Sequence, residues 1–497
     1  MNSLYELSLF DIYEKNARLN KDISAIHWNK EDFSYSDLFL QTCRLAKGLS
    51  GLDLTPGARI AILSCNHPFF FHLFGAASAL NLCLVLINRR LSPDEMAHII
   101  EDTTPSVIFS DPEMADQART LASTHPCLAH CFAIDRDVDP LYQSPPLTKP
   151  VEGRPDDPFM IIHTAAVQGK PRGAVLSQKN IILSNLQLVH TFGLNKTKTY
   201  LNILPLFHIM GVNLGLGMLM AGGKNVIIER FNPRHTLDLI QEQKVTLLGS
   251  FPPILATLLD IIEQERFDLS SLEITAGIEM PDMVKNWEAA TGATFWTMYG
   301  QTETSGLISF SEYFKRPGSA GELSLLATVQ IADDFDCFLP MDTMGEILVK
   351  GPLVFQGYWN SPEVNELTFR NGWHHTGDLG MIDSDGFLFF KGRKQERELI
   401  KPGGENVFPA EVENAILQHE AVENVCVFGV PDPKFGEGIK AVIALHPGKA
   451  LTKEDLIAFT GSLIAGYKKP RYVEFIDRLP RTGDGSIDRV QIKKTYS

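Results

Sequence analysis

The chain has few cysteines, no basic N-terminal leader and no excess of positive charge. Seven cysteines in 497 residues, an odd number, do not form the disulfide framework of a small secreted protein. The opening segment MNSLYELSLFDIYEKN lacks a basic region and a cleavage site, so secretion is not expected. The 45 basic and 60 acidic residues give a net charge of −15, which argues against a nucleic-acid-binding surface. We therefore expect a cytoplasmic protein whose anionic ligands need a local cationic pocket.

The chain also lacks an uninterrupted apolar run suited to crossing a membrane. The longest apolar stretch, PFFFHLFGAASALNLCLVLI at residues 68–87, has the length of a membrane span. Asn81 interrupts it, the following LCLVLI has the character of a strand, and basic residues flank only one end. These features predict a buried helix followed by a buried strand, and no stable membrane insertion.

A compact group of cysteine and histidine residues, HPCLAHC at residues 125–131, raises the alternative of a zinc site, because both residue types bind zinc. The spacing is cramped, Pro126 lies inside the group, and no second cysteine pair is nearby. A surface loop between strands is the preferred interpretation.

Alternating strand and helix patterns predict an α/β protein with a large N-terminal domain of mainly parallel sheets flanked by helices. The length of the chain and its 44% hydrophobic residues suggest two or three domains. The character of the chain changes near Gly392, after which shorter elements predict a small mobile α+β domain. We place the domains at residues 1–393 and 394–497. The clearest strand and helix patterns are ARIAILS (58–64), SVIFSD (106–111), KNVIIER (224–230) and PILATLLDIIE (253–263).

Two clusters dominate the second half of the chain. The first is YGQTETSG, residues 299–306, and the second runs from residue 372 to residue 413 and contains Asp378, Arg393 and the pair Gly403–Gly404. In this order and separation they resemble the adenylate-forming superfamily of acyl-CoA synthetases, 4-coumarate ligases, luciferases and nonribosomal adenylation domains. The resemblance extends from about residue 35 to residue 489. It implies ATP and coenzyme A as ligands, and a C-terminal domain that rotates between an adenylation pose and a thioester pose.

The pair Thr302–Glu303 places a hydroxyl beside a carboxylate just after an apolar strand. Hard oxygen ligands of this kind suit Mg²⁺ and phosphate, whereas the structural alternative is a polar turn with a capping threonine. The resemblance implies that Thr302 contacts the α-phosphate, that Glu303 binds Mg²⁺, that Tyr299 lies along the adenine, and that Gln301 belongs to the same nucleotide site.

Asp378 offers a carboxylate that can accept both ribose hydroxyl groups, a charge-assisted contact that selects nucleosides. Alternatively it orders a tight turn before Leu379–Gly380. The resemblance places Arg393 on the same sugar and implies that Gly403 and Gly404 line the path of the pantetheine arm.

Two apolar segments resemble the acyl-binding part of the family. The motif LPLFHIMG, residues 204–211, implies that His208 lies between the acyl pocket and the coenzyme A tunnel, although a lone histidine is more often structural. The segment TAGIEMP, residues 275–281, implies that Gly277 lies at the floor of the carboxylate pocket. Apolar neighbours such as Met210 favour an uncharged aliphatic or aryl acid.

The phosphate loop departs from the family pattern. It reads TAAVQGKPRG, residues 164–173, and keeps Thr164, Gly169 and Arg172 as candidate phosphate contacts. Ala-Ala-Val-Gln replaces a centre of hydroxyl groups and glycine, which removes donors and backbone freedom that would bind β- and γ-phosphates. The loop also lacks the G-K-[ST] of a Walker motif. We expect an altered pyrophosphate grip.

A second departure lies near the C-terminus, where PRTGDGS, residues 480–486, has Ser486 in the place of the family's catalytic lysine. Serine donates one hydrogen bond but neutralises no charge. Loss of one preorganised stabilising group costs roughly 10²–10³-fold in rate. An engineered substitution, a natural enzyme with another cation and a protein without adenylation activity all remain open. The hinge is irregular too, and Gln395 and Arg397 are both candidates for its pivot.

The resemblance implies an AMP-forming acid–thiol ligase that activates a fatty or aryl acid through an acyl-adenylate to an acyl-CoA, using ATP, Mg²⁺ and coenzyme A. One alternative is a half-active or non-catalytic relative that binds nucleotide and acyl groups. Another is an aryl-acid adenylating protein that loads a separate carrier. The acid itself stays unassigned, and a homodimer stays open as the assembly.

Overall fold

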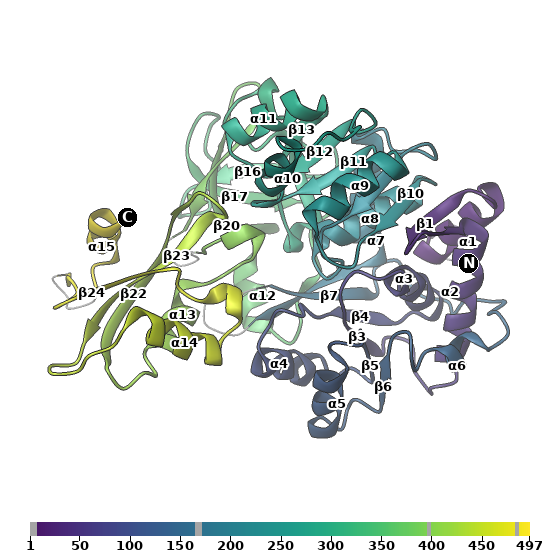
Figure 1. Ribbon diagram of the computed structural model, residues 1–497, viewed down its shortest axis with the longest axis horizontal. Coiled ribbons are helices and arrows are strands. Elements are labelled where there is room, and N and C mark those ends of the chain that lie inside the picture. Colours follow the sequence, from purple (N-terminus) through teal and green to yellow (C-terminus); the bar gives the residue numbers. More distant parts are fainter. Residues whose placement is uncertain (1–6, 165–170, 395–398, 483–486) are drawn as a thin grey trace.

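The computed structural model in Figure 1 describes residues 7–164, 171–394, 399–482 and 487–497. Its helices and strands alternate along the first half of the chain, as expected. The helices are α1 (Leu9–Leu19), α2 (Tyr35–Leu49), α3 (Phe69–Leu80), α4 (Pro93–Thr103), α5 (Ala115–Thr124), α6 (Asp139–Tyr142), α7 (Gln178–Thr191), α8 (Ile209–Met220), α9 (Pro233–Gln243), α10 (Ile254–Ile262), α11 (Pro281–Thr291), α12 (Pro362–Thr368), α13 (Pro409–Ile416), α14 (Lys453–Leu463) and α15 (Arg489–Tyr496).

The first large sheet has the strand order β18-β8-β7-β4-β3-β5-β6 within the described residues. Its pairs are parallel from β7 to β6 and antiparallel at β7–β8 and β8–β18. Parallel strands are buried on both faces and favour continuous apolar sequence, which fits the fully buried CLVL of β4. The strands are β3 (Arg59–Leu63), β4 (Cys83–Leu86), β5 (Val107–Ser110), β6 (His130–Ala133), β7 (Pro158–Thr164), β8 (Arg172–Ser177) and β18 (Gly357–Tyr358).

The second large sheet has the strand order β15-β14-β13-β12-β11-β9-β10-β1-β2 in the described part of the chain. Its central strands are parallel, and antiparallel strands close both edges. The two large sheets confirm the predicted α/β fold. The strands are β1 (Ser24–Trp28), β2 (Glu31–Ser34), β9 (Thr199–Asn202), β10 (Lys224–Ile227), β11 (Leu247–Ser250), β12 (Ile274–Gly277), β13 (Thr294–Gln301), β14 (Gly306–Glu312) and β15 (Glu322–Leu323).

The apolar run at residues 68–87 forms the buried helix α3 and then the buried strand β4, as its sequence predicts. Asn81 ends the helix in a left-handed conformation with φ of 53°. The core around α3 joins α1, α2, α8 and the first sheet into one apolar cluster. Among the described residues, no helix is both long and apolar enough to span a membrane.

A third, antiparallel sheet was not predicted from the sequence. Its strand order is β16-β17-β20-β19, with β21 on the other part of β20, over the described residues. It brings Asp378 of β20 opposite Arg393 of β21 as Cα partners. The strands are β16 (Thr328–Ala332), β17 (Gly345–Lys350), β19 (Phe369–Arg370), β20 (Trp373–Ile382) and β21 (Leu388–Arg393).

The C-terminal part forms a small α+β domain, as expected. Strand β22 (Val422–Asp432) pairs antiparallel with β23 (Gly436–Leu445), which pairs parallel with β24 (Tyr472–Ile476). Helices α13 and α14 pack on one face of this sheet around Val412 and Leu456. Figure 1 shows this yellow lobe to one side of the body, away from α1.

Candidate active site

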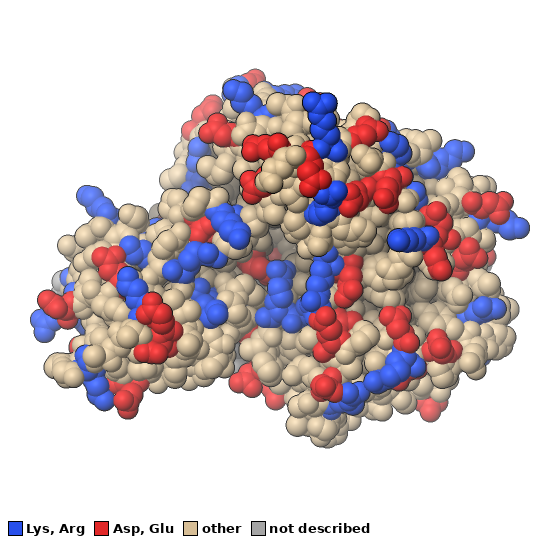
Figure 2. All heavy atoms as spheres, viewed as in Figure 1, with Lys and Arg blue, Asp and Glu red and all other residues tan. Residues whose placement is uncertain are grey.

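A cavity of about 550 Å³ lies where the two large sheets, the third sheet and the C-terminal domain meet. Both clusters identified in the sequence contribute to its wall. Figure 2 shows Lys and Arg side chains around a hollow between the body and the C-terminal lobe, and Arg89, Arg90 and Arg230 are among the residues that line the cavity. Each of the three also forms an ion pair with a carboxylate, so the cavity wall carries charges of both signs.

Asp378 is a buried carboxylate of the cavity with three side-chain partners. Its Oδ2 atom accepts hydrogen bonds from the Tyr299 hydroxyl and the Gln301 amide, each at 2.7 Å. Its Oδ1 atom accepts from Nε of Arg393, also at 2.7 Å. The Asp378 side chain is only 2% exposed. Burial and the neighbouring carboxylate raise the pKa of Tyr299 well above its ordinary value, so its hydroxyl stays a donor.

Glu303 lies in the 3₁₀ turn η2 (Thr302–Thr304), directly after β13. Its Oε1 atom accepts hydrogen bonds at 2.9 Å from the hydroxyl groups of Thr164 and Tyr358. Thr164 ends β7, and its Cα partner across the hairpin is Arg172, the first residue of β8. All of these residues and Thr302 line the cavity, so the fold unites the phosphate loop with the Thr302–Glu303 pair.

The oxygen atoms around Glu303 suit a Mg²⁺ ion that is bound jointly by the protein and by the phosphates of a substrate. Mg²⁺ needs one or two protein carboxylates, and it keeps waters and phosphate oxygens as its other ligands. Glu303 supplies one carboxylate beside the hydroxyl groups of Thr302 and Thr164. No cluster of three or more histidine, cysteine or carboxylate side chains suited to a metal occurs in the described ranges. Residues 125–129 connect α5 to β6, whereas His130 and Cys131 belong to β6 itself. The expected loop between strands is therefore a helix-to-strand connection that covers only part of the cysteine–histidine group.

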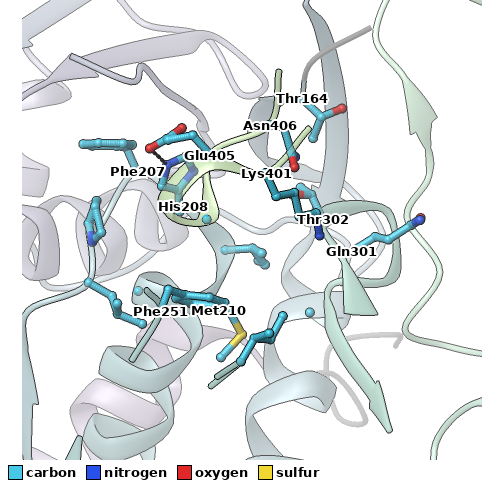
Figure 3. Close-up of a pocket in the computed structure, with 18 of the residues that line it drawn as sticks. Thr164, Phe207, His208, Met210, Phe251, Gln301, Thr302, Lys401, Glu405 and Asn406 are labelled. Carbon is cyan, nitrogen blue, oxygen red and sulfur yellow. Dashed lines mark hydrogen bonds and ion pairs between the residues drawn. The ribbon is translucent and has the colours of Figure 1, made fainter. Parts of the chain in front are cut away.

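His208 precedes α8 and lies opposite a carboxylate from the C-terminal domain. Its Nε2 atom is 3.1 Å from Oε1 of Glu405, and Figure 3 shows the two side chains pointing toward each other. Asn88 donates to Oε2 of Glu405 at 3.2 Å, and Arg90 forms an ion pair with Oε1. Burial would raise the pKa of Glu405, but His208, Arg90 and Asn88 outweigh it and lower the pKa to about 2.

Gly403 and Gly404 lie in η5 (Pro402–Gly404) and line the cavity. Both have left-handed backbone, with φ of 59° and 84°. A Cβ atom on Gly404 would lie 3.4 Å from the Phe251 side chain, and one on Gly403 would lie 3.2 Å from the Pro252 carbonyl oxygen. The pair therefore combines a conformation that favours glycine with close packing against the body.

Lys401 is a cavity residue that the sequence did not reveal. It lies just before η5, and its backbone N–H donates to Glu437 at 2.7 Å. Burial and the nearby Arg393 lower the pKa of its ammonium group to about 8. Figure 3 shows Lys401 extending into the cavity together with Glu405 and Asn406. A lysine two residues before the glycine pair was the signal in the sequence.

Among the described residues that line the cavity, Gly277 is absent and its neighbour Ile278 is present. The expected place of Gly277 at the floor of the carboxylate pocket is therefore not seen. A Cβ atom on Gly277 would lie 1.7 Å from the carbonyl oxygen of Ser250 on β11. The glycine therefore permits close pairing of β12 with β11. The apolar part of the cavity contains Met210 and Phe251, whose side chains appear in Figure 3.

A second cavity of about 680 Å³ adjoins the first. Ile278 and Met298 line both. Its aromatic residues include Tyr299 and Phe390, whose rings are stacked with centroids 5.8 Å apart and planes inclined by 29°. The Tyr299 hydroxyl reaches Asp378, so this aromatic pair continues directly from the carboxylate of the first cavity.

Four residues singled out in the sequence lie outside the described residues. These are Gly169 of the phosphate loop, Ser486 near the C-terminus, and the two hinge candidates Gln395 and Arg397. The Ala-Ala-Val-Gln centre of the phosphate loop, residues 165–168, lies outside them as well.

The fold and the cavity define a nucleotide-binding enzyme with a separate C-terminal domain, and the comparisons agree. The model of the family described as "AMP-binding enzyme" matches residues 13–359, and that of "AMP-binding enzyme C-terminal domain" matches residues 411–486. The chain belongs to this AMP-binding enzyme family, and its full-length relatives are acid–CoA ligases.

The individual relatives are named for different acid substrates. The chain is 30% identical to feruloyl-CoA synthase of Amycolatopsis sp, over 97% of this chain and 98% of that protein. It is 29% identical to the long-chain-fatty-acid–CoA ligase FadD13 of Mycobacterium tuberculosis, over 93% of each. A solved structure of the Bacillus subtilis o-succinylbenzoate CoA synthetase, a double mutant bound with its product analogue, aligns with a TM-score of 0.87 and 27% identity over 98% of both chains.

Proposed function

We propose that this ligase uses ATP to convert an uncharged aliphatic or aryl acid to its acyl-CoA through an acyl-adenylate. The observation that carries the proposal is one continuous cavity. It joins the bonded carboxylate Asp378, the Glu303–Thr164 pair and the glycine pair of the C-terminal domain. In this proposal the first binds the ribose of ATP, the second binds its phosphates, and the third lines the path of the pantetheine arm of coenzyme A.

In the adenylation step, Asp378 and Arg393 orient the ribose, while Thr302, Thr164 and Arg172 bind phosphate oxygens. Glu303 would hold Mg²⁺, which would supply neutralisation of phosphate charge. The carboxylate of the acid attacks the α-phosphorus, the bond to the bridging oxygen breaks, and pyrophosphate leaves. Activation exchanges a poor leaving group on the acyl carbon for AMP.

In the thioester step, the thiolate of coenzyme A attacks the acyl carbon and AMP departs with the bonding electrons. The contacts of Glu405 with His208, Arg90 and Asn88 support the proposal that the described arrangement corresponds to this step. Lys401 then stabilises negative charge beside the α-phosphate, because it extends into the cavity near Asp378 and Arg393. The C-terminal domain that changes pose is assigned to residues 394–497.

The apolar wall around Met210 and Phe251 supports an acid without a second charge. Relatives named for feruloyl-CoA and for long-chain fatty acids span aryl and aliphatic acids, and both classes stay within the proposal.

A second candidate is a relative that binds nucleotide and acyl groups with little adenylation. It is favoured by Ser486 and by the Ala-Ala-Val-Gln centre of the phosphate loop, residues 165–168. Incubation with ATP, coenzyme A and a panel of aryl and fatty acids, followed by mass spectrometry, separates the two. The ligase forms both acyl-AMP and acyl-CoA from at least one acid. Formation of neither, with AMP still bound, supports the second candidate.

A further inference from the structure

Glu279 is a carboxylate for which the two steps above have no use. It lies between β12 and α11 and lines the second cavity beside Tyr299, Tyr313 and Ser319. Among the described residues, its buried Oε1 atom has no hydrogen-bond partner, although the backbone N–H of Met280 donates to the carboxylate. Leaving a buried acceptor unpaired costs free energy, so this oxygen is suited to a donor from a ligand.

The position of the second cavity identifies the part of the ligand that reaches it. Asp378, which is proposed to hold the ribose, bonds to the Tyr299 hydroxyl, and Tyr299 with Phe390 forms an aromatic wall of this cavity. A base attached to that ribose extends along this wall, where stacking on aromatic side chains stabilises it. Glu279 then lies at the rim of the base. The χ3 torsion of glutamate is broad, so the carboxylate of Glu279 can turn at little cost to direct an oxygen toward the base.

We propose that Glu279 accepts a hydrogen bond from the exocyclic amino group of adenine and so selects ATP over nucleotides that lack this group. Guanine and hypoxanthine carry a carbonyl oxygen at the same ring position, which repels an ionised carboxylate. Burial raises the pKa of Glu279 to about 7, so this discrimination is expected above that pH and the calorimetry is run at pH 8. An amino group on the acid substrate is a second source of the same donor. The apolar side chains Met210 and Phe251 line the first cavity, whereas Glu279 lines the second, and this favours the base. The inference rests on the proposed nucleotide binding.

Calorimetry with AMP and with purine riboside 5′-monophosphate, which differ only by the amino group, tests the assignment. The wild type is expected to bind AMP about tenfold or more tightly than the analogue, the effect of a hydrogen bond to a charged group. Glu279→Ala should abolish this difference through loss of AMP affinity alone. Glu279→Gln keeps the size and one acceptor oxygen and should give an intermediate ratio. Unchanged affinity of both variants for the analogue shows that they are folded.

Equal binding of both nucleotides by the wild type, or a preference for AMP that persists in Glu279→Ala, would overturn the role of Glu279 and leave nucleotide binding intact. Absence of AMP binding by the wild type would overturn the proposed function together with this inference. Acids with and without an amino group form the second arm. If Glu279→Ala changes the ranking of these acids and leaves the nucleotide ratio unchanged, Glu279 reads the acid and the assignment to the base is wrong.

Discussion

The carboxylate of Glu405 in the C-terminal domain lies 3.1 Å from Nε2 of His208, which is 197 positions earlier in the chain. Arg90 and Asn88 contact the same carboxylate, so Glu405 joins the two domains at the wall of the cavity. A second junction involves Lys468, which contacts Glu95 of the body and Glu411 of its own domain. Buried charged contacts thus link the domains at two places.

Glu405→Gln is expected to slow thioester formation from preformed acyl-AMP by about tenfold or more, because a charged hydrogen bond contributes roughly 1.5–3 kcal/mol. Acyl-AMP formation should change little, since we propose that this junction belongs to the thioester step. Glu413→Gln is the matched control, because Glu413 pairs with Arg489 within the C-terminal domain. Rapid-quench measurement of both half-reactions checks the prediction, and an equal loss of both would contradict it.

The same contact predicts the behaviour in acid. Because the pKa of Glu405 is lowered from 4.5 to about 2, its contribution is fully present above pH 4.5 and is lost as the pH falls toward 2. Small-angle scattering measures the docking of the C-terminal domain. Between pH 5 and 8 the Glu405 carboxylate stays ionised, so it should contribute no pH dependence to this docking. Glu405→Gln should remove the acid-dependent part of the change below pH 4.5.

Asp378→Ala should weaken AMP binding by roughly 1.5–3 kcal/mol or more, the value of lost charged hydrogen bonds. Tyr299→Phe removes one of the donors to Asp378 and keeps the aromatic wall, so its effect should be clearly smaller. Isothermal calorimetry measures both. Unchanged affinity in Asp378→Ala would exclude a contact with the ribose.

Lys401 predicts a pH dependence of the thioester step. Because its pKa is lowered from 10.5 to about 8, the ammonium group loses its charge above about pH 8. The rate of the wild type with preformed acyl-AMP and coenzyme A should fall above this pH. Lys401→Arg stays charged and should lack the fall, while Lys401→Ala should be slower by roughly 10²-fold at neutral pH. An identical alkaline limb in Lys401→Arg would show that another group titrates.

Ser486→Lys should accelerate acyl-AMP formation by about tenfold or more, because a cation restores charge neutralisation in the adenylation pose. The thioester step should not respond. Ser486→Gln adds size without charge and is the control. Equal adenylation rates in wild type and Ser486→Lys, measured by pyrophosphate release, would mean that another cation already serves this role.

Local patterns predicted the parts of the fold that depend on neighbouring residues. The helix and strand within residues 68–87 and the small C-terminal domain are confirmed. The pairing of Asp378 with Arg393 is also short-range, since the two residues face each other across one hairpin. The third sheet was missed because its central strand, WHHTGDLGMI, does not alternate apolar and polar residues.

Contacts between distant segments could not be predicted from one sequence. Thr164 bonds to Glu303 across 139 positions, and no local pattern gives that distance. Lys401 was overlooked because its position two residues before the glycine pair does not by itself distinguish a lysine that enters a cavity from a lysine in water. The roles of the site residues stay predictions until they are tested by substitution.

The wall that Ile278 and Met298 share between the two cavities has a thermodynamic consequence. An acid large enough to displace the buried Met298 also reshapes the space next to the base. Linkage requires that the acid then changes ATP affinity by the same factor by which ATP changes the affinity for that acid. The ranking of acids is therefore a function of nucleotide concentration, and if the reshaped space binds the base less tightly, large acids compete best when ATP is scarce.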